Sequence, residues 1–391
     1  MALETHPEER LHVVDALRGF ALLALFLVHM LESYELYWAA PQPDWATRLV
    51  FLLFAGKSFS LLALCFGFSF FVLMDRAARK GQDFSGRFAW RLLVLQAIGF
   101  FHVLIYRGDI IQLLSLLGFL LLLAYRMKSN AVIIALAVLC FIQPELWLQF
   151  FAAMKGAAWA AQPPHFAADP QMATYLHGDF LELLRANLLE GQSKWWFMLE
   201  SGRAVQIIGL FLVGMVLGRI GFFARLEAFA TARHVALGLI VVAGLLFHYL
   251  IDAAPQWARQ WGAGDAASRL LTTIFEGYFE LAAASIWMLA ICMAWQTVGR
   301  ALLRPLVAVG RVTLTLYILQ SLVFVPFFYP FGLGLYDKLD GPTRLFIGLL
   351  AISAQIALAN AWFTRFRFGP IEWLWRSLTF LRWDIPIRKR A

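Results

Sequence analysis

Charged side chains are scarce in this chain. Asp, Glu, Lys and Arg make up 15% of its 391 residues, whereas a soluble domain has about 25%. This shortage argues against a water-soluble domain. Hydrophobic residues supply 61% of the chain and the mean hydropathy is +0.70, so the composition predicts an integral membrane protein.

Cysteine is also rare. The three cysteines, Cys65, Cys140 and Cys292, each lie inside an apolar run. They have neither the spacing of a disulfide framework nor that of a metal-binding motif. We therefore expect them to be buried packing residues, and we expect no metal site.

Several familiar motifs are missing from the sequence. It has no Walker loop, no dinucleotide-binding fingerprint, no His-Glu-x-x-His and no Gly-x-Ser-x-Gly. No pair of glycine- or proline-broken helices in matching halves indicates an inverted-repeat transporter. The first apolar run follows Glu4, Glu8 and Glu9 and precedes no small-residue cleavage site. We expect it to be a retained helix rather than a signal peptide.

Long apolar runs are present instead, and they predict about ten membrane-spanning helices. The third and fourth are short and are joined by a tight turn at residues 107–109. With no internal repeat or low-complexity tract, we expect one all-α domain over residues 1–391. The predicted spans lie near residues 13–31, 50–73, 92–106, 110–125, 130–150, 204–218, 234–252, 270–296, 306–329 and 343–362.

The basic residues are unevenly distributed among the connecting loops. One alternating set, from Arg10 to Arg390, carries about 21 basic residues against about ten on the other side. By the positive-inside rule both termini are cytoplasmic, which agrees with an even number of spans. The net charge of +8 is thus interpreted as a topology signal, and no nucleic-acid partner is expected.

Two segments are expected to lie outside the spans. Residues 151–203 form the longest outer loop, and their prolines and tryptophans predict short surface helices that cover a cavity. Residues 364–391 form a cytoplasmic tail. Within it, residues 368–383 are amphipathic and aromatic and predict an interfacial helix on the cytoplasmic leaflet.

The first predicted helix carries Arg18 and His29, eleven residues apart. This spacing places both on the same face, about 16 Å apart along the axis. Asp15 and Glu32 each lie one turn from one of them. In a functional interpretation Arg18 receives an anion and His29, oriented by Glu32, acts as a base. In a structural one, Asp15 and Arg18 form a local ion pair and His29 is an interfacial histidine.

A second polar group is formed by His102 and Asp109, seven residues apart. A sharp turn between them would bring both to an outer vestibule beside His29. Alternatively, Asp109 caps the following helix. Both interpretations fit the sequence.

Other polar residues in the apolar runs fit structural roles. Glu276 and Glu280 lie one turn apart and would neutralise Lys57 or Arg107. We expect most of the uncharged groups to form hydrogen bonds between helices. These groups are Gln206, Gln320, Ser321, Gln355 and Asn360.

The chain also resembles the YeiB-like proteins, a bacterial membrane family (domain of unknown function 418). The resemblance covers nearly the whole chain and is carried by Asp15-Ala-Leu-Arg18-Gly-Phe-Ala-Leu, Lys57-Ser-Phe-Ser-Leu-Leu-Ala-Leu-Cys-Phe-Gly67, Arg91-Leu-Leu-x-Leu with Gly99-Phe-Phe-His102 and Gly108-Asp109-Ile, Gly310-Arg-Val-Thr-Leu-Thr-Leu-Tyr317-Ile-Leu-Gln320-Ser321, Gly332-Leu-Gly-Leu-Tyr336, and Arg365-Phe-Arg-Phe-Gly369-Pro370-Ile-Glu372-Trp373-Leu-Trp-Arg376-Ser-Leu-Thr379.

That family is similar to a wider group of transmembrane acyltransferases, in which an arginine and a histidine on the first helix are separated by ten residues. Arg18 and His29 match this spacing. The resemblance implies that His29 is the catalytic base and that Arg18 lies near the CoA end. Many YeiB-like sequences have asparagine at the position of His29. The catalytic base implied by the resemblance is therefore expected in this member rather than in the whole family.

The leading expectation is an acyltransferase of the bacterial cytoplasmic membrane, crossing it several times among membrane lipids. The expected donor is acyl-CoA, a co-substrate rather than a permanent cofactor, and the acceptor is a hydroxyl or amine on a small molecule or glycan. The expected catalytic residues are His29, Glu32, His102 and Asp109, and Arg18, Arg91 and Arg311 are expected to bind donor phosphates. The chain is also a possible homo-oligomer.

Two other functions fit the same residues. In a transporter or channel for a small solute, the intramembrane charges would line a path through the protein. In a structural or regulatory subunit, they would stabilise a complex with another protein. A closed cavity where His29, His102 and Asp109 converge would favour the enzyme, and a continuous polar path would favour transport.

Overall fold

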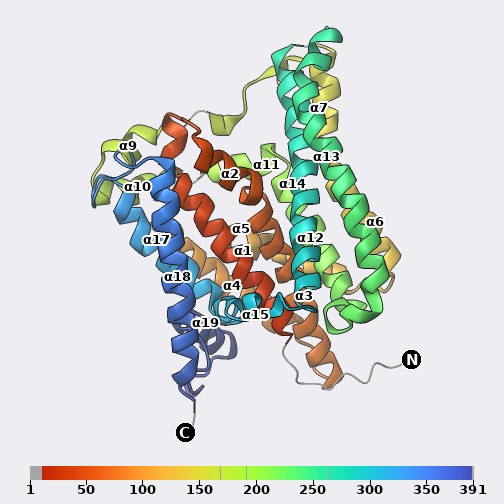
Figure 1. Cartoon of the computed structure of the whole chain (residues 1–391), viewed down its shortest axis with the longest axis vertical. Helices are drawn as coiled ribbons and strands as arrows, with labels where there is room; N and C mark the ends of the chain where they lie inside the picture. Colours follow the sequence, from red (N-terminus) through yellow and green to blue (C-terminus); the bar gives the residue numbers. More distant parts are fainter. Residues whose placement is uncertain (1–10, 168, 191, 263, 390–391) are drawn as a thin grey trace.

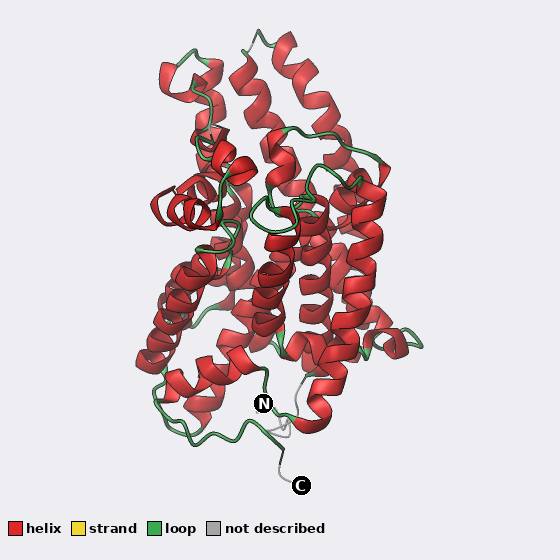
Figure 2. Ribbon diagram, turned by 90° about the vertical axis from the view of Figure 1, so that its left-hand side faces the viewer, coloured by secondary structure: helices red, strands yellow, loops and turns green. Residues whose placement is uncertain are grey.

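The computed structural model describes residues 11–167, 169–190, 192–262 and 264–389. Glu4, Glu8, Glu9, Arg10 and Arg390, which contributed to the sequence predictions, lie outside these ranges. The described residues form helices and connecting loops, with one isolated antiparallel bridge between Phe366 and Arg388 (Figure 2). The all-α prediction is therefore confirmed.

The helices are bounded as follows. The α-helices are α1 His12–Leu31, α2 Trp45–Phe54, α3 Lys57–Arg79, α4 Ser85–Val103, α5 Ile111–Tyr125, α6 Asn130–Ile142, α7 Pro144–Met154, α8 Ala158–Ala161, α9 Met172–His177, α10 Phe180–Glu190, α11 Gln192–Glu200, α12 Arg203–Arg219, α13 Ala230–Gln260, α14 Asp265–Ala294, α15 Arg300–Leu303, α16 Leu306–Arg311, α17 Thr313–Phe328, α18 Gly341–Arg365 and α19 Pro370–Phe380. The 3₁₀ helices are η1 Leu36–Ala39, η2 His165–Ala167, η3 Phe222–Ala224 and η4 Leu226–Phe229.

Among the described residues, six helical segments are long and apolar enough to cross a membrane. A seventh candidate is the pair α11 and α12, which is bent by 69°. The shorter apolar helices α5 and α17 lie beside them. A helical membrane protein is thus established, while the count of about ten spans and their orientation remain predictions.

Three predicted spans are interrupted. The 50–73 run is divided into α2 and α3 at Gly56, whose φ of 77° is readily adopted only by glycine. The 130–150 run is divided at Gln143, which has a φ of 56° and precedes Pro144, a residue that disfavours helical geometry before it. The 306–329 run is divided into α16 and α17 at Val312. Hydropathy alone does not reveal these interruptions.

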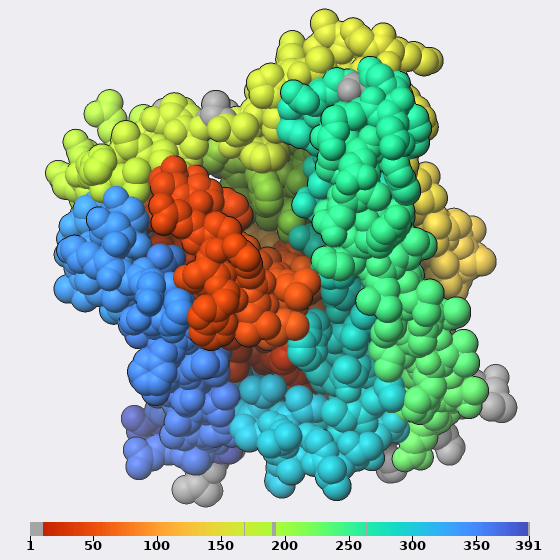
Figure 3. Space-filling view, turned by 45° about the horizontal axis from the view of Figure 1, so that its top comes forward, coloured from red at the N-terminus to blue at the C-terminus, as the bar shows by residue number. Residues whose placement is uncertain are grey.

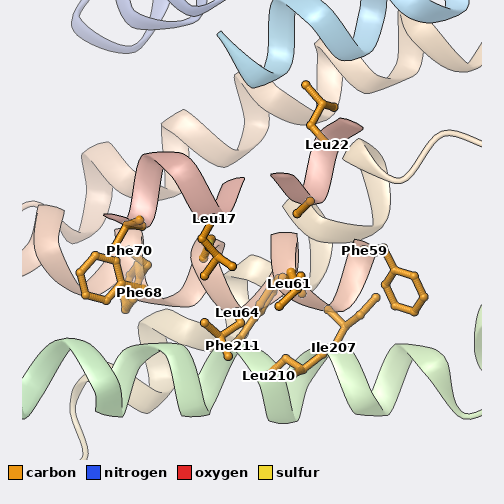
Figure 4. Packing of buried hydrophobic residues seen from close by; sticks show 14 of the residues in the cluster. Leu17, Leu22, Phe59, Leu61, Leu64, Phe68, Phe70, Ile207, Leu210 and Phe211 are labelled. Carbon is orange, nitrogen blue, oxygen red and sulfur yellow. The ribbon is translucent and has the colours of Figure 1, made fainter. Parts of the chain in front are cut away.

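Helix α1 lies in the middle of the bundle, between α13 and α14 on one side and α17 and α18 on the other (Figure 1). In the most apolar 18-residue stretch of the segment that contains α1, 83% of the residues are buried. In the corresponding stretch of the segment that contains α13, only 6% are buried. Leu17, Leu64 and Phe211 belong to one buried cluster that joins α1, α3 and α12 (Figure 4). The functional groups on α1 are therefore held by packing from all sides.

Close helix contacts depend on small residues. A methyl group at Gly310 of α16 would overlap the Asp15 carbonyl of α1. A methyl group at Gly214 of α12 would likewise overlap the Leu64 carbonyl of α3. Small residues that allow backbones to approach are typical of helix pairs within membranes.

Helix α19 packs against α4 and α17 near the end of the chain. Its Glu372 accepts hydrogen bonds from the backbone N–H groups of Leu314, at 2.7 Å, and Thr315, at 3.0 Å, and from the Thr315 hydroxyl, at 2.5 Å. Glu372 thereby caps the first turn of α17, which has no side-chain cap of its own at Val312. Burial raises the pKa of this carboxyl, and the hydrogen bonds from Thr315 oppose that effect.

We expect Glu372→Ala to lower the free energy of unfolding by about 2–4 kcal/mol, because two backbone N–H groups and a hydroxyl lose their acceptor. Glu372→Gln retains an amide oxygen as acceptor and should cost less than half as much. Thermal unfolding of the purified protein in detergent checks both variants. Equal melting temperatures for Glu372→Ala and the wild type would contradict the capping role.

Candidate functional site

The first part of the site surrounds His29 at the end of α1. His29 is 7% exposed. Its Nδ1 lies 3.0 Å from the Tyr106 hydroxyl and 3.6 Å from a Glu32 carboxylate oxygen. Its Nε2 is buried without a hydrogen-bond partner among the described residues. The predicted proximity of His29 and Glu32 is therefore present, and Tyr106 is the closer partner.

The second part is the pair formed by His102 and Asp109. The Nδ1 of His102 lies 2.7 Å from Asp109 Oδ1, and both side chains are buried. The other oxygen of Asp109 accepts the backbone N–H of Gln112 at 3.0 Å, in the first turn of α5. Asp109 therefore contacts the imidazole and also caps the helix as the structural interpretation predicted, while the functional role of the pair stays a prediction.

An ionised carboxylate only accepts hydrogen bonds. Asp109 therefore requires a proton on Nδ1 of His102, which leaves Nε2 for other partners. This Nε2 is buried and has no partner among the described residues. The pair has the arrangement in which a carboxylate orients a histidine for acid–base chemistry.

Aromatic residues connect the two histidines. The Tyr106 ring centroid lies 5.2 Å from that of His29 and 6.0 Å from that of His102. The Tyr317 ring centroid lies 5.0 Å from that of His102. Neither tyrosine is among the site residues expected from the sequence. Tyr106 follows His102 by four residues, which is the only sequence signal for it.

The outer segment, residues 158–200, folds into short helices that lie over this end of the molecule (Figure 3, yellow to yellow-green). It is attached through ion pairs between Arg107 and Asp169 and between Lys194 and Glu35, the latter at 3.3 Å. The Arg107 guanidinium also lies 4.3 Å from the Tyr175 ring centroid. These contacts enclose the polar groups around His29.

The third part is a pocket of about 360 Å³ at the other end of α1. Its walls are mainly apolar side chains of α1, α3, α4, α5 and α17. Five arginines line it: Arg18, Arg91, Arg311, Arg367 and Arg376. The three arginines proposed from the sequence thus lie around one cavity, although they come from α1, α4 and α16.

Three of the five arginines of this pocket have no carboxylate partner among the described residues. Arg91, Arg367 and Arg376 make no ion pair with any residue that the structure describes. Arg91 lies over the Trp375 ring at 3.5 Å. Arg18 lies 3.5 Å from Asp15 and also bonds Ser69. Unpaired guanidinium groups beside an apolar cavity suit a ligand with an anionic head and an apolar or flexible arm.

The pocket extends along α1 toward the histidines and is lined there by Ile110 and Tyr317. Ile110 follows Asp109 directly, and the Tyr317 ring packs on His102. Arg18 lines the pocket, whereas His29 lies outside its lining and contacts Tyr106. The two residues that sequence spacing placed on one helix face therefore have different surroundings, and only Arg18 lines the pocket.

The remaining polar groups are structural. Glu280 forms its ion pair with Arg203 at 2.8 Å. Lys57 lies close enough to Glu276 and Glu280 to interact with them electrostatically, as predicted, whereas Arg107 pairs with Glu35 and Asp169 instead. Lys57 also donates to the Phe51 carbonyl at 3.2 Å. Gln320 and Gln355 form the predicted bond between helices at 2.7 Å. The cysteines Cys65, Cys140 and Cys292 are free.

These features define the chain as an all-helical membrane protein with buried histidine–carboxylate groups beside a cationic pocket. The resemblance to the YeiB-like DUF418 family is supported: residues 217–382 match the family described as "Protein of unknown function (DUF418)". "Uncharacterized protein YxaH" of Bacillus subtilis is 27% identical, over 99% of this chain and 98% of its own length. "Uncharacterized protein YeiB" of Escherichia coli is also 27% identical, over 95% and 96%. An "Uncharacterized 39.9 kDa protein in amylase 3'region" of Bacillus acidopullulyticus is 23% identical, over 98% of both chains.

Proposed function

We propose that the protein is an acyltransferase of the bacterial cytoplasmic membrane, which moves an acyl group from an acyl-CoA-type donor to a hydroxyl or amine acceptor. The observation that carries this proposal is the arginine-lined apolar pocket, whose lining includes Tyr317, the ring that packs on His102 of the His102–Asp109 pair. It rests also on the resemblance in which Arg18 and His29 match an acyltransferase motif.

The donor would be bound by charge at one end and by apolar contact along its arm. Phosphate oxygens form strong, short hydrogen bonds with guanidinium groups, and Arg91, Arg367 and Arg376 have no other ionic partner among the described residues. The apolar walls formed by Leu22, Leu95 and their neighbours would hold the arm that leads to the thioester.

The transfer step uses both histidines. His29 Nε2 takes the proton from the acceptor's O–H or N–H group, and the freed lone pair forms a bond to the thioester carbonyl carbon. The carbon–sulfur bond breaks, and the sulfur leaves with a proton from the protonated ring of His102. The products are an ester or amide and a free thiol. His29 then releases its proton and His102 regains one from solvent.

Tyr106 and Glu32 orient the His29 ring from its Nδ1 side, and Asp109 orients the His102 ring in the same way. In the proposed topology of about ten spans with both termini in the cytoplasm, the donor enters from the cytoplasmic side and the acceptor from the outer side. The acceptor is then a small molecule or glycan that reaches His29 beneath the outer segment.

The shape of the pocket supports an enzyme better than a transporter. A transport path would continue through the protein with polar lining. Here the lining is largely apolar. The lining residues on the side of the two histidines are Ile110 and Tyr317.

The proposal is tested with purified protein in lipid nanodiscs, supplied with radiolabelled acyl-CoA and a panel of hydroxyl and amine acceptors. We expect His29→Ala to lower transfer by about 10²–10⁴-fold, because the acceptor proton has no base. His165→Ala is the matched control, since His165 is 62% exposed on the outer segment and pairs with Glu200. Unchanged transfer by a folded His29→Ala variant would rule out the proposed base.

A further inference from the structure

Tyr317 separates the arginine-lined pocket from the His102–Asp109 pair. Its side chain lines the pocket, and its ring centroid lies 5.0 Å from that of His102 at an interplanar angle of 54°. We propose that Tyr317 determines acyl-chain length, so that the wild-type protein prefers short acyl groups. This inference rests on the proposed function and adds to it a residue that selects the donor.

The Tyr317 ring is fixed in place. The residue is 6% exposed, and its hydroxyl accepts the backbone N–H of Ile110 at 3.3 Å. Ile110 immediately follows Asp109, so this bond ties the ring to the segment that orients His102. A ring held on both α17 and the start of α5 forms a defined boundary rather than a mobile side chain.

The boundary limits the space available to the acyl group. With its phosphates at the arginines, a CoA-type donor fills the pocket with its arm and brings the thioester toward Tyr317. Atoms beyond the carbonyl must then fit in the space that the Tyr317 ring, packed on His102, leaves at this end of the pocket. Each extra methylene that a closed site cannot accommodate lowers kcat/KM by about 10–200-fold, so a short acyl group is favoured.

The test compares acetyl-CoA with octanoyl-CoA as donors for the wild type, Tyr317→Ala and Tyr317→Phe. We expect the ratio of kcat/KM for octanoyl over acetyl to rise at least about tenfold in Tyr317→Ala, because the boundary is removed. Tyr317→Phe keeps the ring and loses only the hydroxyl acceptor, so its ratio should stay within about twofold of the wild type. An unchanged ratio in an active Tyr317→Ala variant would overturn the proposal.

A binding measurement separates this inference from the proposed function. S-ethyl-CoA and S-octyl-CoA are thioethers that cannot transfer their alkyl groups by this chemistry, and their Kd values are measurable without turnover. If the wild type transfers no acyl group but Tyr317→Ala still raises relative octyl affinity at least about tenfold, the enzyme proposal fails and the role of Tyr317 stands.

Equal Kd ratios in the wild type and Tyr317→Ala, or no binding of either thioether to the wild type, would overturn the role of Tyr317. If Tyr317→Ala fails to fold, Tyr317→Leu provides the smaller side chain and Tyr317→Trp the larger one. We expect Leu to shift the preference toward the octyl compound and Trp toward the ethyl compound. Shifts in the same direction would contradict a boundary set by side-chain size.

Discussion

Asp109→Asn should lower the rate of acyl transfer by about 10²–10⁴-fold while leaving KM for the donor within a few-fold of the wild type. The Asp109 carboxylate accepts from Nδ1 of His102 at 2.7 Å, and both groups are shielded from water. An asparagine at this position cannot stabilise the positive charge of a protonated ring. His102 would then be a poor proton donor to the leaving sulfur.

This substitution separates the chemical role of Asp109 from its structural role. The amide oxygen of asparagine still accepts the Gln112 N–H that caps α5, because asparagine caps helices about as well as aspartate. We therefore expect a change of less than about 1 kcal/mol in the free energy of unfolding. A large fall in kcat without a fall in melting temperature is the diagnostic result.

The measurement is the thiol released per enzyme under saturating donor, together with the melting temperature in the same detergent. Glu200→Gln is the control, because it changes the carboxylate of another histidine pair, with His165 on the outer segment, at 2.5 Å. We expect this control to keep the wild-type rate. An Asp109→Asn variant that retained most of its rate would remove His102 from the proposed step.

The sequence predicts the helices well where long apolar runs decide them, as in α1 and α18. Hydropathy does not predict the interruptions at Gly56 and Gln143, because the few polar residues there leave the surrounding segments apolar enough to resemble single spans. The left-handed backbone at Gln143 is one of only five such non-glycine positions in the described residues. Such conformations are maintained by surrounding structure rather than by hydropathy.

Site residues that interact along one segment were predictable from spacing. His29 with Glu32 and His102 with Asp109 lie three and seven residues apart, and both pairs are present. Contacts between segments that are distant in the sequence could not be predicted from spacing. Glu280 pairs with Arg203, 77 residues away, and a charge on one helix does not reveal which neighbour will face it. Tyr317 lies in a motif that carries the family resemblance, but no site role was expected for it, because a tyrosine in an apolar helix resembles ordinary packing.

The second large effect is expected on the affinity of the arginine-lined pocket for acyl-CoA. We expect the double variant Arg91→Gln and Arg376→Gln to weaken acyl-CoA binding by about 10²–10³-fold, because hydrogen bonds to charged groups contribute about 1.5–3 kcal/mol each. Neither arginine makes an ion pair with a described residue, so their removal leaves no carboxylate uncompensated in that part of the chain. Kd is measured by titration in nanodiscs. Salt should weaken wild-type binding more than that of the variant.

The ligand itself provides the strongest control for this prediction. S-acyl pantetheine has the thioester and the flexible arm of acyl-CoA but no phosphate, so the double variant should bind it about as well as the wild type does. Arg79→Gln is the matched protein control, since Arg79 bonds Asp75 at the end of α3 and lies outside the pocket lining. If the double variant loses affinity equally for both ligands, the arginines shape the pocket rather than bind phosphate. If it loses affinity only for acyl-CoA, the donor's anionic head lies at the end of the pocket away from His102.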